Sequence, residues 1–350
     1  VIQLWETMNA WVLGGFEKSY EKMGVRFDKI YRESNTYLLG KKIVDEGLQS
    51  GTFFRKEDNS VWINLEAEGL DEKLVLRKDG TSVYITQDMG TAQLKFEDFG
   101  AKKSVYVVGN EQDYHFEVLF HILKKLNKPY SLGNYHLSYG MVDLPSGKMK
   151  SREGTVVDAD DLMSDMVQTA RERTTELGKI EGFSASELDN LFNQLGLGAL
   201  KYFLLKVDPK KRMLFNPEES IDFQGNTGPF VQYTHARICS MIRKAKEQGI
   251  DFQVQSIQNT TLSPTEQELI YLLGTYKSKI EEAADQFSPS IIAQFAYEVA
   301  KQFNKLYNEL SILNEEDAIK RNIRLTLAEL TGKTIREAFE LLGIQSPERM

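Results

Sequence analysis

Strand-like and helix-like segments alternate between residues 82 and 142, and this alternation limits the fold more than any other feature of the sequence. Residues 82–86 form a strand-like run that is followed by a helical pattern. Residues 104–109 repeat this step, and another strand is expected over residues 135–142. Such alternation predicts parallel strands joined by crossover helices, so this part of the chain is expected to form an α/β, doubly wound parallel sheet.

Beyond residue 158 the strand signals stop and helical patterns remain. Apolar residues recur at helical spacing in seven segments, which are residues 159–178, 184–206, 228–248, 264–286, 288–310, 315–331 and 332–343. Upstream, residues 1–24 and 35–48 also predict helices, and residues 52–76 predict short strands. The predicted fold class is therefore α/β plus all-α. Its predicted parts are an α/β domain, a helical connector and a helical bundle, over residues 1–157 (with an insertion around 30–75), 158–215 and 216–350.

The composition excludes several classes of protein. A single cysteine, Cys239, cannot form an internal disulfide, and four scattered histidines give no zinc-type spacing, so no structural metal is expected. No apolar run approaches the roughly 20 residues of a membrane helix, so no membrane partner and a cytoplasmic location are expected. The net charge of −8 argues only weakly against nucleic acid, because local basic patches decide such binding.

Polar side chains follow two of the predicted strands. Tyr84 and Asp88 lie around the end of the first, and Gln112 and His115 follow the second. Each residue alone is more often a helix cap or a surface group. Together, a hydroxyl, a carboxylate and an amide at adjacent strand ends would suit a cationic, hydrogen-bonding ligand.

A basic, glycine-flanked loop follows the last predicted strand. Lys148, Lys150 and Arg152 alternate between Gly147 and Gly154. Taken alone, such a segment is more often a solvated turn. Its position after the sheet favours a second interpretation, in which the cations stabilise the charge of a phosphate chain.

The helix predicted over residues 228–248 has an apolar stripe and a basic face. Arg237, Arg243, Lys244 and Lys246 lie away from the apolar stripe. A basic face is commonly only solvated, but in an acidic chain it could also approach a nucleic-acid backbone.

Four segments resemble the arginyl-tRNA synthetases, which are class I aminoacyl-tRNA synthetases. In chain order the first is residues 75–88, which end in Asp-Gly-Thr-Ser-Val-Tyr-Ile-Thr-Gln-Asp, and the second is residues 107–116, which begin with Val-Val-Gly-Asn-Glu-Gln and include His115. The third is residues 223–237, which end in Gly-Pro-Phe-Val-Gln-Tyr-Thr-His-Ala-Arg, and the fourth is the last residues, 342–350. The resemblance covers nearly the whole chain. It implies the second half of a Rossmann-like catalytic domain followed by a helical anticodon-binding domain.

The resemblance also implies roles for individual residues. Tyr84 and Asp88 would receive the guanidinium of L-arginine, with Gln112 near its α-amino group. The loop would be the family's ATP-clamping segment, with Lys148, Lys150 and Ser151 as catalytic residues. The implied ATP-binding residues are His115, Lys148, Met149, Lys150 and Ser151. The implied tRNA-binding residues are Tyr233, Arg237, Arg243, Lys244 and Met350.

The implied activity is ligation of L-arginine to tRNA(Arg), with ATP and Mg²⁺ and without a prosthetic group. A monomer is expected. The family's first nucleotide-binding motif and amino-terminal domain are absent from the sequence, so the chain alone is expected to be inactive. Its loop sequence, Lys-Met-Lys-Ser-Arg, also leaves open which cation acts as the second lysine of the family motif. The alternatives are a noncatalytic tRNA-binding module, a class I synthetase for another amino acid and, least favoured, a structural scaffold.

Overall fold

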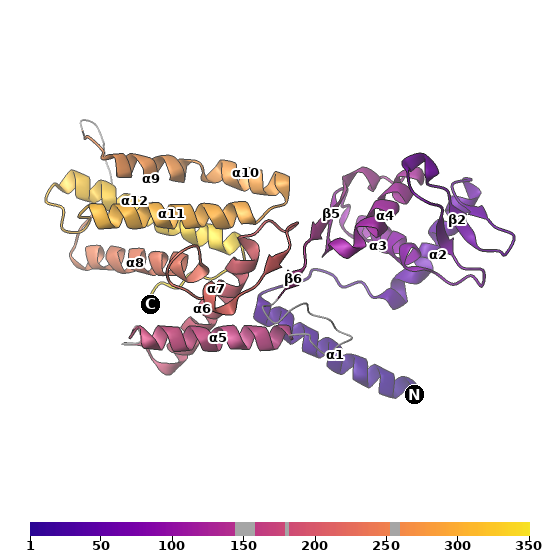
Figure 1. Ribbon diagram of the computed structural model, residues 1–350, viewed down its shortest axis with the longest axis horizontal. Helices are drawn as coiled ribbons and strands as arrows, with labels where there is room; N and C mark the ends of the chain where they lie inside the picture. The colour runs from indigo at the N-terminus through magenta and orange to yellow at the C-terminus, as the bar shows by residue number, and fades with distance from the viewer. Residues whose placement is uncertain (144–157, 179–181, 253–259) are drawn as a thin grey trace. The chain divides into compact units, whose positions relative to one another are not determined.

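A computed structural model describes residues 1–143, 158–178, 182–252 and 260–350 of the chain (Figure 1). Contacts within the chain divide it into two compact units. One unit comprises residues 26–141, and the other comprises residues 1–25 together with 142–350. The three-part division expected from the sequence stays a prediction.

The unit of residues 26–141 begins with a helix and a small antiparallel sheet. Helix α2 (Glu33–Gln49) precedes β1 (Phe54–Arg55), β2 (Val61–Ile63) and β3 (Lys73–Leu76), which pair in the order β1-β2-β3. A short 3-10 helix, η1 (Glu66–Glu68), connects β2 to β3. Buried residues of α2, β2 and β3 share one apolar core with α3 (Tyr84–Phe99) and α4 (Asp113–Lys125).

A parallel β-α-β arrangement follows. β4 (Ser104–Gly109) leads through η2 (Asn110–Gln112) into α4, and the chain returns through η3 (Ser131–Gly133) to β5 (Asn134–Tyr139). The two strands pair in parallel along their full length. The predicted strand, helix and strand are confirmed here, although the last strand ends at Tyr139 rather than at residue 142.

The strand predicted over residues 82–86 is wrong, because α3 already begins at Tyr84. Val83 caps this helix, and its backbone N–H donates to Oγ1 of Thr86 at 3.2 Å. The Thr86 hydroxyl, which is fully buried, donates in turn to the backbone carbonyl of Val75 in β3. The first bond satisfies the backbone N–H of Val83 at the start of the helix, and the second anchors the helix to the antiparallel sheet. Together they outweigh the strand propensity of Val83, Tyr84 and Ile85.

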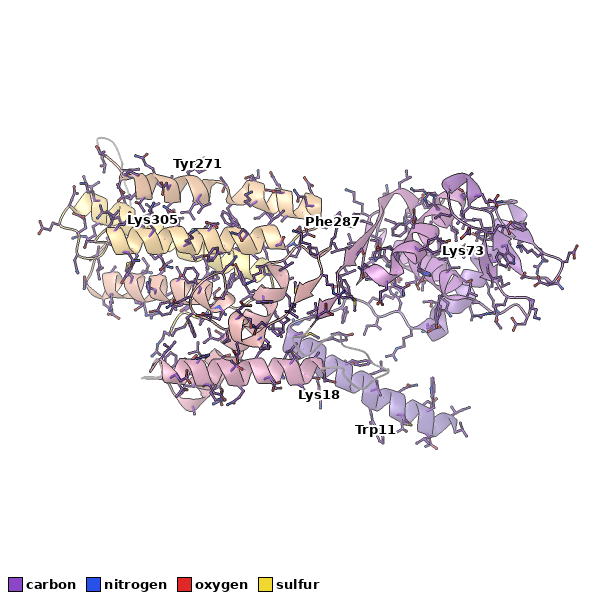
Figure 2. The ribbon with its side chains drawn as sticks, viewed as in Figure 1. Trp11, Lys18, Lys73, Tyr271, Phe287 and Lys305 are labelled. Carbon is purple, nitrogen blue, oxygen red and sulfur yellow. The ribbon has the colours of Figure 1, made fainter. Side chains whose placement is uncertain are left out.

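Helix α1 (Ile2–Met23) ends at Gly24, whose φ of 72° is the left-handed conformation that favours glycine at this position. Near its end, Ser19 and Lys22 make hydrogen bonds to Asp160 and Ser164 of α5 (Ala159–Glu176). The amino-terminal part of α1 carries exposed apolar side chains, among them Trp11, which projects from the helix in Figure 2 and is 72% exposed.

The rest of this unit is mostly helical. Its further helices are α6 (Ala185–Leu205), α7 (Pro217–Ser220), α8 (Gly228–Glu247), α9 (Pro264–Gly274), α10 (Tyr276–Gln286), α11 (Ser290–Glu309) and α12 (Ala318–Leu341). α8, α9, α11 and α12 pack around one large apolar core, and Figure 1 shows α9 and α10 running one after the other along α11. A short parallel pair, β6 (Val142–Asp143) and β7 (Met213–Leu214), was not predicted from the sequence.

Two helix boundaries differ from the prediction. The helix expected over residues 264–286 is two helices, interrupted where Thr275 donates its hydroxyl to the carbonyl of Leu272 at 2.7 Å. The helices expected over residues 315–331 and 332–343 are one, α12. Gly332 does not end α12. A Cβ at residue 332 would lie 2.9 Å from Cγ2 of Ile238, so the glycine permits close packing of α12 on α8.

Candidate functional site

Tyr84 and Asp88 lie one turn apart on α3, so their side chains share a face of that helix. Tyr84 is 75% exposed and lines a cavity of about 290 Å³. The described residues that line it are Lys73, Leu74, Val83, Tyr84, Ile85, Tyr114, His115 and Val118. The structure therefore brings Tyr84 together with His115, which comes from the start of α4.

Asp88 is not among the described residues that line this cavity, but it contacts His115, which is one of them. Its Oδ2 lies 2.6 Å from Nε2 of His115, and the carboxylate is 40% exposed. A carboxylate has about four acceptor positions, so a bond from His115 leaves room for donors of a ligand. A hydroxyl and a carboxylate presented side by side complement a planar guanidinium.

Gln112, the third residue predicted to bind arginine, comes from another element than Tyr84 and Asp88, which both lie on α3. It ends η2, is exposed, and is not among the described residues that line the cavity of Tyr84. Next to it, Asp113 accepts a hydrogen bond from Ser138 at 2.6 Å and lies 3.4 Å from Nδ1 of His136. Sequence patterns did not single out His136 and Ser138, because only the pairing of β4 with β5 brings them to the start of α4.

The predicted ATP-clamping residues Lys148, Met149, Lys150 and Ser151 lie outside the described residues. Their roles stay predictions.

The five residues predicted to bind tRNA lie together in the other unit. Tyr233, Arg237, Arg243, Lys244 and Met350 all line a cavity of about 670 Å³, here called the α8 cavity. The described lining also includes Phe183, Tyr307, Arg349 and residues 310–314. It therefore holds four cationic side chains and, among the described residues, no carboxylate side chain, although the chain has a net charge of −8.

Arg237 is held inside this cavity by aromatic rings. Its Cζ lies 4.8 Å from the ring centroid of Tyr233 and 5.0 Å from that of Tyr307. Its NH1 also donates to Oδ1 of Asn304 at 2.6 Å. Aromatic rings beside cations are the combination that binds unstacked bases and their phosphates.

Three aromatic or cationic residues that line the α8 cavity were not identified from the sequence. Tyr307 comes from α11, Phe183 precedes α6, and Arg349 lies near the end of the chain. Arg349 packs over Phe183 with 4.4 Å from Cζ to the ring centroid. These residues are distant in sequence, so only tertiary packing assembles them.

Among the described residues, no helix is both long and apolar enough to cross a membrane. No cluster of three or more His, Cys, Asp or Glu side chains in the same residues has a metal-binding arrangement.

Two family models match the chain. The model described as "tRNA synthetases class I (R), catalytic domain" matches residues 2–216, and that described as "DALR anticodon binding domain" matches residues 231–350. The chain is 57% identical to the arginine–tRNA ligase of Amoebophilus asiaticus over 100% of the chain and 59% of that protein. It is also 57% identical to that of Phocaeicola vulgatus, over 99% of the chain and 57% of that protein. The chain thus spans a little more than half the length of these relatives.

Solved structures show the same fold. The Thermus thermophilus arginyl-tRNA synthetase matches with a TM-score of 0.83 and 23% identity, over 95% of this chain and 62% of that one. The Plasmodium falciparum arginyl-tRNA synthetase matches with a TM-score of 0.83 and 20% identity, over 99% of this chain and 58% of that one. The predicted combination of a class I α/β domain with an all-α anticodon-binding domain is confirmed, and the chain belongs to the arginyl-tRNA synthetase family of class I aminoacyl-tRNA synthetases.

Proposed function

We propose that this chain supplies the arginine pocket and the anticodon-binding part of a cytoplasmic, monomeric arginine–tRNA ligase. The reaction would join the carboxylate of L-arginine to the α-phosphate of ATP, releasing pyrophosphate. A terminal ribose hydroxyl of tRNA(Arg) would then attack the arginyl carbonyl and release AMP. The observation that carries this proposal is the α8 cavity, which gathers all five residues predicted to bind tRNA.

In the arginine pocket, Asp88 and Tyr84 would receive the guanidinium. The bond between Asp88 and His115 supports this role, because it fixes the carboxylate at the start of α4. Gln112 would approach the α-amino group of the substrate. Its exposed position at the end of η2 leaves its amide accessible to a ligand.

ATP would be held by His115 and by Lys148, Met149, Lys150 and Ser151, with Mg²⁺ accompanying its phosphates. Lys148 and Lys150 would stabilise the negative charge that develops on the leaving pyrophosphate, and Ser151 would donate to it. The rate would come from positioning and electrostatics, without a covalent protein intermediate.

The α8 cavity would receive the anticodon loop of tRNA(Arg). Tyr233 and Met350 would contact its bases, while Arg237, Arg243 and Lys244 would face the backbone. We also propose that the chain divides functionally into a catalytic part over residues 1–157, a connector over 158–215 and an anticodon-binding part over 216–350.

A fusion enzyme tests the function. The chain would be joined to the part of the Amoebophilus asiaticus arginine–tRNA ligase that precedes the matched region, and charging of tRNA would be measured with each amino acid. The expected result is charging of tRNA(Arg) with arginine by the fusion, its loss in the Asp88→Asn fusion, and no charging by the chain alone. Charging with another amino acid would favour a class I synthetase of different specificity. Tight tRNA binding without charging by the fusion would favour a noncatalytic tRNA-binding module.

A further inference from the structure

The last residues of the chain have no regular secondary structure, yet several of their backbone carbonyls accept hydrogen bonds from side chains. Residues 343–350, here called the C-terminal segment, follow α12. Lys201 of α6 donates to the carbonyl of Gly343 at 2.6 Å. Three residues of α8 donate further along the segment, so side chains replace the partners that a helix or a sheet would give these carbonyls.

The three donors from α8 lie on one face of that helix. Gln232 donates to the carbonyl of Gln345 at 2.7 Å, His235 Nδ1 lies 3.0 Å from that of Pro347, and Arg243 reaches that of Glu348 at 3.3 Å. Their spacings of three and eight residues place them within about 80° of one another around the helix. Because a carbonyl only accepts, the proton of His235 that faces it is carried by Nδ1.

A neighbouring face of α8 lines the α8 cavity. Tyr233, Arg237, Ser240 and Lys244 follow one another at helical spacing, about 100° round the helix from the first face. One helix thus presents Gln232 and His235 to the C-terminal segment and a second set of polar residues to the cavity, while Arg243 contacts both. The segment ends in Arg349 and Met350, which line the same cavity.

Burial separates Gln232 and His235 from the residues that line the cavity. Gln232 is fully buried and His235 is 2% exposed, whereas Lys244 is exposed. Gln232 is enclosed by the close crossing of α6 and α8, where a Cβ on Gly198 would lie 2.5 Å from its Nε2. Its Nε2 also donates to the carbonyl of Gln194 in α6 at 3.0 Å. Gln232 and His235 are therefore committed to the fold and are not available to a ligand.

We propose that Gln232 and His235 are positioning residues, which hold the C-terminal segment against α8 so that Arg349 and Met350 form one wall of the α8 cavity. The inference rests on the proposed function for its RNA-binding consequence. Arg349 also holds the C-terminal segment in place, because its NH2 donates a hydrogen bond to the carbonyl of Gly182 at 3.0 Å. Without Gln232 or His235, the carbonyl of Gln345 or of Pro347 would lose a hydrogen-bond partner. The C-terminal segment would then no longer be held against α8 as a wall of the cavity.

Two substitutions of His235 separate the hydrogen bond from the bulk of the side chain. In His235→Asn the amide nitrogen takes about the place of Nδ1, so the bond to Pro347 is kept. In His235→Gln the nitrogen lies about where Nε2 was, and the bond is lost. Gln232→Met removes the other donor at similar volume, and Lys246→Ala, which changes a residue of α8 outside the described lining of the cavity, is the matched surface control.

Hydrogen–deuterium exchange of the peptide covering the C-terminal segment is measured first, in the whole 350-residue chain. His235→Gln and Gln232→Met should increase its exchange, and His235→Asn and Lys246→Ala should not. If the buried variants do not fold, Arg243→Met gives the same test from the exposed end of the face. Unchanged exchange in His235→Gln, or equal increases in His235→Gln and His235→Asn, would overturn the proposal.

Binding of an anticodon stem-loop RNA from an arginine tRNA is measured second. His235→Gln should weaken it about tenfold, and His235→Asn should restore it. Faster exchange without weaker binding would overturn the positioning role. Absence of binding by the unsubstituted chain would instead contradict the proposed function, while the exchange experiment would still decide whether the two residues hold the segment.

Discussion

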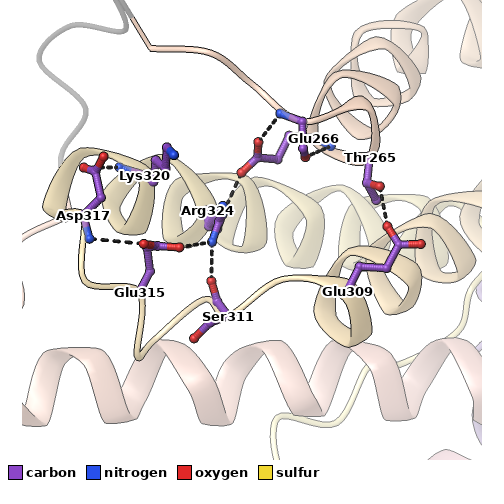
Figure 3. A network of polar contacts seen from close by, with 9 residues as sticks. Thr265, Glu266, Glu309, Ser311, Glu315, Asp317, Lys320 and Arg324 are labelled. Carbon is purple, nitrogen blue, oxygen red and sulfur yellow. Dashed lines mark hydrogen bonds and ion pairs between the residues drawn. The ribbon is translucent and has the colours of Figure 1, made fainter.

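Arg324 of α12 donates from Nε to Oε1 of Glu266 in α9 at 2.7 Å, and their side chains are only 7% and 3% exposed (Figure 3). NH1 of Arg324 also donates to the carbonyl of Ser311 at 2.6 Å and to Glu315. Ser311 lines the α8 cavity. One buried guanidinium therefore joins α9, α12 and the segment between α11 and α12 that forms part of the cavity.

Replacement of Arg324 by Met should lower the free energy of unfolding by about 3–5 kcal/mol. The physical reason is that Glu266 would remain buried without its cationic partner. Thermal or denaturant unfolding of the whole chain measures the loss. Lys305→Met is the matched control, because the pair of Lys305 with Glu268 is exposed and its removal should change little. Equal effects of the two substitutions would contradict this account of the network.

Asp88→Asn should weaken binding of L-arginine by about 10–100-fold. The amide keeps the size of the carboxylate but loses the charge that attracts the guanidinium, and hydrogen bonds to charged groups contribute about 1.5–3 kcal/mol. Isothermal titration with L-arginine measures the change. Asp98→Asn is the control on the same helix, since Asp98 pairs with Lys29 about 15 Å further along α3. If Asp88→Asn bound arginine as tightly as the unsubstituted chain, Asp88 would not be part of the arginine pocket.

Lys244→Ala should reduce the salt dependence of tRNA binding. Each phosphate neutralised by a cation contributes about 0.7–0.9 to the slope of log affinity against log salt concentration. Lys244 lines the α8 cavity and Lys246 is not among its described lining residues, so Lys246→Ala should leave the slope unchanged. The slopes are measured by titrating tRNA at several salt concentrations. A slope that falls equally for both lysines would indicate binding by the whole basic face of α8.

The burial of His235 should make stability depend on pH. Burial holds the pKa of His235 below its ordinary value, and the positive charge of Arg336 lowers this pKa further. The hydrogen bond to the carbonyl of Pro347 and the negative charge of Glu348 act in the opposite direction and raise it. The thiol of Cys239 is the other titratable group beside the ring. The unfolded chain then takes up a proton near pH 6.5 and the folded chain only at lower pH. The stability that neutral His235 contributes is therefore complete above about pH 6.5 and is lost as the pH falls towards the folded pKa.

His235→Asn should reduce this dependence, because asparagine does not titrate. The difference in melting temperature between pH 7.5 and pH 5.5 is measured by calorimetry for both proteins. A smaller difference in the variant is the expected result. An unchanged difference would assign the pH dependence to other groups.

The residues of α8 show what local sequence could predict. Helical spacing placed Arg237, Arg243 and Lys244 away from the apolar stripe, and all three line one cavity. Tyr233, which lines the same cavity, was indicated only by the family resemblance. Tyr307 and Arg349 could not be found in this way, since they reach the cavity from other parts of the chain. Their position depends on tertiary packing, which leaves no periodic signal in the sequence.

The start of α3 shows where local preference fails. Val83, Tyr84 and Ile85 favour a strand, but the bond from Thr86 to Val75 and the packing of α3 on α2 make the segment helical. The roles predicted for Tyr84 and Asp88 stay predictions, and the helix changes only how the two side chains are arranged. Tyr84 and Asp88 share a face at helical spacing, and the predicted neighbour His115 meets Asp88.

Binding of the chain to a panel of purified tRNAs at one moderate salt concentration tests the central claim most directly. A fixed concentration is needed because non-specific attraction to phosphates varies steeply with salt. The account predicts that tRNA(Arg) binds at least about tenfold more tightly than the other tRNAs, and that Tyr233→Ala removes this preference. Equal, weak binding of all tRNAs would contradict the claim that the α8 cavity recognises the anticodon loop of tRNA(Arg).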